Sequence, residues 1–84
     1  MDHVIICIHP FIMRQEVMVY QNGVCVKHAD CTMDEVAKVC YNLCKEYNIH
    51  RVDLTGVIKY CSKIKEDLLT PDKYNNFEFE FNFY

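Results

Sequence analysis

The order of the hydrophobic patterns constrains this chain most strongly, because three strand-like segments precede the first helical one. Residues 4–8 form a continuous apolar run, which favours a central strand buried on both faces. Residues 17–20 and 24–27 flank Asn22-Gly23, a pair that accepts positive φ at both positions of a two-residue turn. The sequence therefore predicts an antiparallel hairpin beside a buried first strand.

Two amphipathic segments follow the hairpin. Thr32 and Glu35 have the spacing of a capping box, in which the two side chains satisfy opposite backbone donors at a helix start. This helix is predicted to end near Asn48, and a short strand over residues 51–56 leads through Gly56 into a second helix that Pro71 closes. The predicted apolar faces are Val36, Ala37, Cys40, Leu43, Cys44 and Tyr47 in the first helix, and Val57, Cys61, Ile64 and Leu68 in the second.

Aromatic and polar residues alternate over the last eight positions, 77–84. The alternation predicts a strand with its phenylalanines on one face, preceded by an irregular connection over residues 70–76. The complete order is βββαβαβ in a single domain of 84 residues. Right-handed crossovers place both helices on the same face of the sheet. We therefore expect an α/β fold with a five-stranded mixed sheet.

The segments around His9-Pro10-Phe11 and Thr55-Gly56 carry a resemblance to a known family. The topology resembles that of the ribonuclease H-like superfamily, whose five strands have the order 3-2-1-4-5. This resemblance covers nearly the whole chain. The nearest likeness is to its Holliday-junction resolvase branch, in which the first strand ends in Asp-Pro-Gly and the fourth strand ends in a glutamate. In this sequence His9 and Thr55 stand at those two positions.

The resemblance implies a fold without the family's nuclease chemistry. In the family the two acids hold divalent metal ions that activate a water, and hard cations such as magnesium need oxygen ligands. An imidazole at His9 and a hydroxyl at Thr55 are poor replacements. Asp53 is the nearest acid, and because strand alternation turns it to the face opposite Leu54, we do not expect it to replace Thr55.

Six cysteines fall mostly at apolar positions of the predicted strands and helices, which favours free, buried thiols over a secreted disulfide scaffold. Cys40 and Cys44 could ligate zinc with His28 or His50, but no second closely spaced pair completes four ligands. Nothing in the sequence places a base beside Cys31, Cys61 or another thiol to make it a nucleophile. We therefore predict neither a metal site nor a cofactor. The six positions are Cys7, Cys25, Cys31, Cys40, Cys44 and Cys61.

An apolar loop and an uncovered sheet face favour a protein-interaction role. The loop is Phe11-Ile12-Met13, and Met18 or Tyr20 would lie on the face that the helices leave free. We expect a non-catalytic module that binds a protein partner or a second copy of itself. The alternative is a metal-dependent nuclease or small-ligand binder that uses His9, Asp53 and Thr55 in the cleft between the first and fourth strands. For His9, a capping contact with a neighbouring carbonyl is the favoured role.

Charge and composition bound the setting. The net charge of -3 and the lack of an evident basic patch argue against sequence-independent nucleic-acid binding. The amino terminus has neither the charged start of a secretion signal nor the length of a membrane span, so a cytoplasmic location is expected. The small size and the rich use of Ile, Asn, Lys and Tyr resemble those of viral accessory proteins, such as those of phages, which would act in the host cytoplasm.

Overall fold

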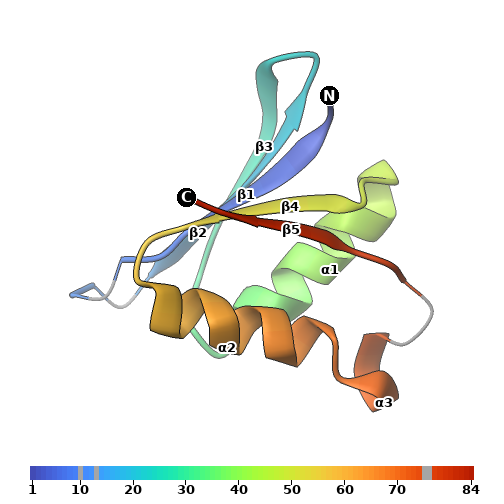
Figure 1. Ribbon diagram of the computed structural model, residues 1–84. Helices are drawn as coiled ribbons and strands as arrows, with labels where there is room; N and C mark the ends of the chain where they lie inside the picture. The colour runs from blue at the N-terminus through green and yellow to red at the C-terminus, as the bar shows by residue number, and fades with distance from the viewer. Residues whose placement is uncertain (10, 13, 75–76) are drawn as a thin grey trace.

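Five strands and three helices make up the computed structural model, which describes residues 1–9, 11–12, 14–74 and 77–84 (Figure 1). The side chains of residues 71 and 72 are outside this description. The elements are β1 (His3–Cys7), β2 (Gln15–Gln21), β3 (Val24–Cys31), α1 (Val36–Tyr47), β4 (Arg51–Thr55), α2 (Ile58–Leu68), α3 (Pro71–Tyr74) and β5 (Glu80–Phe83).

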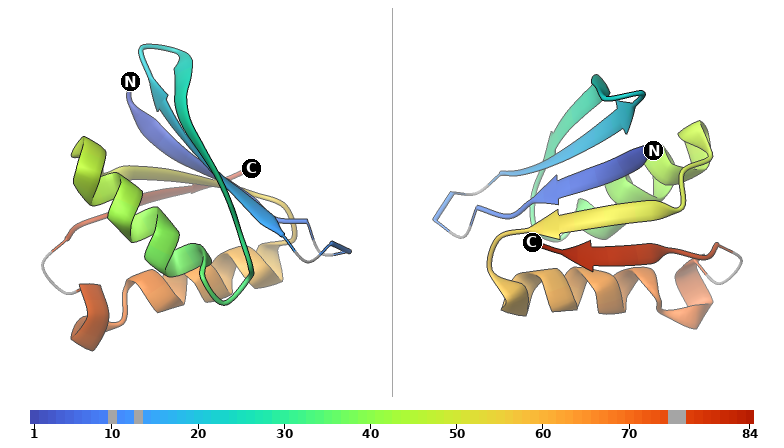
Figure 2. Two further views of the ribbon diagram at one scale, coloured as in Figure 1. Left: turned by 180° about the vertical axis from the view of Figure 1, so that it is seen from behind. Right: turned by 45° about the horizontal axis from the view of Figure 1, so that its top comes forward.

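The sheet has the predicted order β3-β2-β1-β4-β5. Strands β1, β2 and β3 pair antiparallel, whereas β4 is parallel to both β1 and β5, so the sheet is mixed as expected. Helix α1 packs under β1, β2 and β3, and α2 packs under β4 and β5. The right-hand view of Figure 2 shows the strands in front of α1, with α2 running along the β5 side, and the left-hand view shows α1 from behind the sheet. The prediction of an α/β fold with this strand order is confirmed.

One face of the sheet holds the core. Strand β1 buries Val4 and Ile6 completely, while the alternate residues Ile5 and Cys7 are only half-buried. The prediction that the first strand is buried on both faces is therefore wrong, because among the described residues no helix covers the second face. Alternation in β2 and β4 adds Val17, Val19, Val52 and Leu54 to the same core, which α1 and α2 close from below.

The Asn-Gly turn forms as predicted, with φ of 53° at Asn22 and 78° at Gly23. The strands on either side are longer than the apolar runs, because β2 begins at Gln15 and β3 continues to Cys31. A register shift falls opposite the step between Val19 and Tyr20. Gln15 and Glu16 thus belong to β2 although they are polar, because only one face of the strand has to be apolar.

Local signals fix the ends of α1. The carboxylate of Glu35 accepts hydrogen bonds from the backbone N–H and the hydroxyl of Thr32, at 3.1 and 2.9 Å. This is half of the predicted capping box, because the Glu35 N–H bonds to the Thr32 carbonyl in a turn that precedes the helix. At the other end Asn48 takes the left-handed conformation, and the Ile49 N–H bonds to the Cys44 carbonyl.

The carboxyl-terminal strand is shorter than predicted. Only Glu80–Phe83 pairs with β4, and the one-turn helix α3 occupies part of the connection expected to be irregular. The rings of Phe77 and Phe79 lie before the strand and pack on Tyr41 of α1, with centroid distances of 5.7 and 6.5 Å. Aromatic packing rather than strand pairing therefore attaches this segment to the core.

The thiols should differ sharply in reactivity. The structure has six free cysteines, of which Cys25 alone is exposed and Cys7 is half-buried. Burial raises the pKa of the Cys7, Cys31 and Cys61 thiols, and the contact with Cys44 together with burial raises that of Cys40 well above its usual value. We expect one fast thiol in a titration with a chromogenic disulfide, lost in Cys25→Ser, and release of the buried thiols only in denaturant. Rapid reaction of several thiols in the native protein would contradict this arrangement.

Candidate functional site

The face of the sheet opposite the helices, here called the open face, gathers the polar side chains of the strands. Cross-strand register places Ile5 beside Met18 and Asp53, and places Cys7 beside Glu16 and Thr55. Tyr20 lies at the far end of this face, stacked on His3 with ring centroids 5.4 Å apart. The open-face residues are His3, Ile5, Cys7, Glu16, Met18, Tyr20, Cys25, His28, Asp30, Arg51, Asp53, Thr55, Glu80 and Asn82.

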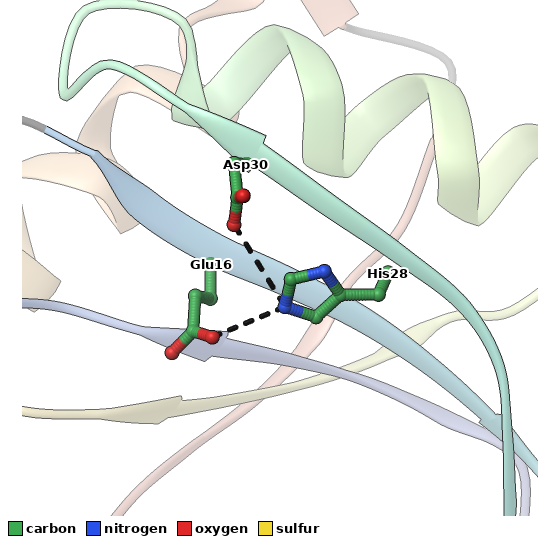
Figure 3. A group of neighbouring side chains, drawn as sticks. All are labelled: Glu16, His28 and Asp30. Carbon is green, nitrogen blue, oxygen red and sulfur yellow. Dashed lines mark hydrogen bonds and ion pairs between the residues drawn. The ribbon is translucent and has the colours of Figure 1, made fainter.

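Four ligand-type side chains, here called the histidine–carboxylate cluster, meet on the open face: His9, Glu16, His28 and Asp30. Glu16 is at the centre, with its Oε2 atom 2.6 Å from His9 Nε2 and its Oε1 atom 3.1 Å from His28 Nε2. His28 Nε2 also lies 3.8 Å from Asp30 Oδ1. Figure 3 shows His28 between the two carboxylates, with its ring directed at both.

Strand register brings these residues together. Asp30 is the direct cross-strand partner of Glu16, and His28 precedes it by two positions on the same face of β3. His9 approaches from the other side, two residues past Cys7, which is the β1 partner of Glu16. Strands β2 and β3, together with the segment that follows β1, thus supply the cluster, and its side chains are between about one third and one half exposed.

Electrostatics favour an ionised carboxylate at the centre. Hydrogen bonds from His9 and His28 hold the pKa of Glu16 below its ordinary value. The Glu16 charge in turn adds to the effect of burial that raises the pKa of Cys7. The cluster is therefore an anionic position with two imidazoles that can donate protons to it or coordinate beside it.

A second polar group lies further along the open face, centred on Asp53. Arg51 donates from Nε and Nη2 to the two oxygens of this carboxylate at 3.0 and 3.2 Å, and Asn82 donates at 3.2 Å. Tyr84 accepts a further hydrogen bond from Arg51 at 3.2 Å. Asp53 is buried, and these partners link β4 to β5, so its contacts are those of a structural carboxylate.

The three predicted ligand residues are held apart. His9 turns to Glu16, Asp53 turns to Arg51, and the Thr55 carbonyl accepts the Ile8 N–H at 2.9 Å. Asp53 and Thr55 do share the open face, because strand alternation separates both from Leu54. The positions of the family's acids, His9 and Thr55, therefore hold no pair of carboxylates and do not fit its magnesium site.

Four exposed apolar side chains, here called the end patch, lie on the segments that follow β1 and β4. Phe11 is 98% exposed and Ile12 58%, while Val57, just before α2, and Ile58, its first residue, are 42% and 70% exposed. The two turns are held together by the Ile8–Thr55 hydrogen bond. Met13 of the predicted loop lies outside the described residues.

The other predicted interaction residues do not join this patch. Met18 lies in the middle of the open face and Tyr20 at its opposite end, and both are half-buried. Val57 was predicted in the core because it fits the helical spacing of α2, but it precedes the helix and turns outward. Sequence periodicity thus missed half of the end patch.

Two hollows flank these surfaces. A cavity of about 270 Å³ lies beside His9 and Gln15, closed by Ile12, Met33 and Tyr60, and neither Asp53 nor Thr55 lines it. A wider one of about 640 Å³ lies at the other end of β4, between the amino terminus, His50 and Glu78. The predicted cleft with three polar groups is therefore replaced by a small cavity in which His9 alone of the three takes part.

Within the described residues no helix has both the length and the apolar character that crossing a bilayer requires, since the longest, α1, has 12 residues.

Comparisons with known proteins leave the family open. A scan against protein-family models, a search of curated proteins and a search of solved structures each gave no match to this chain.

Proposed function

We propose that this protein is a non-catalytic interaction module built on a ribonuclease H-like scaffold, and that it binds a second copy of itself through the end patch. The strand order supports the scaffold assignment, and the mismatch at His9 and Thr55 supports the lack of nuclease activity. The observation that carries the binding role is the exposure of Phe11, Ile12 and Ile58 at one end of the sheet.

The end patch is shaped for a protein rather than a small ligand. Its side chains project from two turns, and the adjoining cavity of about 270 Å³ is smaller than an ordinary ligand pocket. A protruding phenylalanine with aliphatic neighbours is typical of a residue that anchors a protein interface. A contact of this kind needs no catalytic group.

A second copy is the occupant that the chemistry of the patch favours. The four side chains carry no charge, so two patches can meet without charge complementarity, and the net charge of -3 repels only weakly. Facing patches would remove on the order of 800 Å² from water, taking roughly 200 Å² for an aromatic ring and less for each aliphatic group. An area of that size predicts a weak, reversible dimer.

Sedimentation over a concentration series tests this proposal. We expect a monomer–dimer equilibrium that Phe11→Ser and Ile58→Ser each weaken at least about tenfold, as loss of an interface anchor does. The matched control is Leu69→Ser, because Leu69 is 51% exposed at the far end of α2. A monomer at all concentrations up to about 1 mM, or equal weakening by the control, would contradict the proposal.

The nuclease alternative predicts a different result. Metal-dependent cleavage of branched or single-stranded nucleic acid that disappears in His9→Ala would require a catalytic site at the carboxyl end of β1. We expect no cleavage by the wild-type protein or by His9→Ala, since neither His9 nor Thr55 supplies a carboxylate at the positions that the family uses.

A further inference from the structure

The histidine–carboxylate cluster has the composition of a transition-metal site. Its converging ligands are one imidazole nitrogen and two carboxylates, and the nitrogen suits zinc, cobalt or nickel better than magnesium or calcium, which favour oxygen alone. No thiol takes part. Cys40 and Cys44, which the sequence does not favour as zinc ligands, lie in the core behind the sheet, with their sulfurs 4.0 Å apart.

The distances agree with ligands around one ion. Tetrahedral zinc with bonds of about 2.1 Å separates neighbouring ligand atoms by about 3.4 Å. In the cluster the separations are 3.1 Å between Glu16 Oε1 and His28 Nε2, and 3.8 Å between His28 Nε2 and Asp30 Oδ1. The ligand atoms of Glu16, His28 and Asp30 all lie within 4.8 Å of one another. His9 contacts the other oxygen of Glu16 and is not part of this converging group.

The sheet preorganises the cluster. Glu16 and Asp30 form a cross-strand pair, and His28 shares their face, so the spacing of these Cα atoms is fixed by backbone hydrogen bonds. His9 is set by Gln15, whose side chain bonds to both the N–H and the carbonyl of His9. Because the side chains are partly exposed, a hydrated ion can reach them without opening the fold.

We propose that Glu16, His28 and Asp30 bind one zinc-class divalent ion on the open face of the sheet, with water completing its coordination. The ion would replace the hydrogen bond that now joins His28 to Glu16, while His9 keeps its bond to the other oxygen of Glu16. It would tie β2 to β3. This site is separate from the end patch, so it is independent of whether the protein forms a dimer.

Cobalt(II) is the probe that tests the proposal most directly, because its absorption spectrum reports the ligands. We expect one cobalt ion per chain, a visible spectrum of nitrogen and oxygen ligands without a thiolate charge-transfer band, and displacement by zinc. Glu16→Gln and His28→Ala should each weaken binding by at least about tenfold, as loss of a ligand does. His3→Ala is the matched control, because His3 lies on the same face beside Tyr20 and outside the cluster.

Several results would overturn the site. Absence of cobalt binding at micromolar protein would do so, as would a thiolate charge-transfer band or equal weakening in the control. Glu16 is half-buried and His28 is exposed, so we expect both variants to fold. A melting curve for each variant distinguishes loss of binding from loss of folding. If Glu16→Gln alters the fold, Asp30→Asn provides a second ligand variant with the same expected loss.

Discussion

Replacing Gly56 by alanine should destabilise the fold by about 3 kcal/mol or more. Gly56 has φ of +131°, a conformation that side chains rarely adopt, and an added Cβ would lie 2.8 Å from both the Cβ and the carbonyl oxygen of Ile8. The Ile8 backbone bonds to Thr55 and cannot move away without breaking that contact. For a domain of this size the change corresponds to a fall in Tm of roughly 15 °C, measurable by thermal denaturation.

Gly23→Ala supplies the matched control. Gly23 also has a positive φ, +78°, but a Cβ there would meet nothing within 4 Å. We therefore expect a cost of about 1 kcal/mol, from backbone strain alone. The difference between the two variants measures the steric contact between Ile8 and the β4–α2 turn, and equal losses would show that this contact has no effect on stability.

The layout of the fold follows from signals that are local in the sequence. Asn22-Gly23 specifies the hairpin, Asn48 ends α1 in the left-handed conformation, and Gly56 allows the close turn after β4. The handedness of the crossovers then leaves one arrangement for both helices. Such signals determine strand order because each acts within a few residues and does not depend on the rest of the chain.

Segments whose structure depends on distant contacts could not be predicted in this way. Phe77 and Phe79 alternate like strand residues, yet they pack on Tyr41 rather than pairing with β4. Val57 fits the apolar period of α2, but it precedes the helix and faces solvent. Periodicity describes which side of an element is apolar, whereas the bounds of the element depend on its neighbours in space.

The histidine–carboxylate cluster was missed for a related reason. Glu16 and Asp30 are 14 positions apart in the sequence, and only the hairpin register makes them neighbours. The register shift opposite Val19 and Tyr20 also breaks the simple alternation of β3, so counting from the turn gives an unreliable face for His28. The signal available was the His28-x-Asp30 spacing, which places two ligands on one side of a strand.

Gln15→Leu should cost about 2–3 kcal/mol and should release the loop that carries Phe11. Gln15 is only 2% exposed, and its amide accepts the His9 N–H at 2.5 Å and donates to the carbonyls of His9 and Ile12 at 3.2 and 3.1 Å. Leucine fills the same space but leaves these backbone groups without their partner. Chemical denaturation measures the loss of stability, and amide hydrogen exchange at His9, Phe11 and Ile12 should become faster.

Gln21→Leu is the matched control, because it makes the same change in the same strand without touching the loop. Gln21 ends β2 at the hairpin and is half-buried, so Gln21→Leu should change stability by less than about 0.5 kcal/mol and leave exchange at His9, Phe11 and Ile12 unchanged. Because the buried amide of Gln15 bonds to both His9 and Ile12, on either side of Phe11, Gln15→Leu should weaken dimerisation. Retention of dimerisation by a folded Gln15→Leu protein would show that the loop keeps its conformation without this amide.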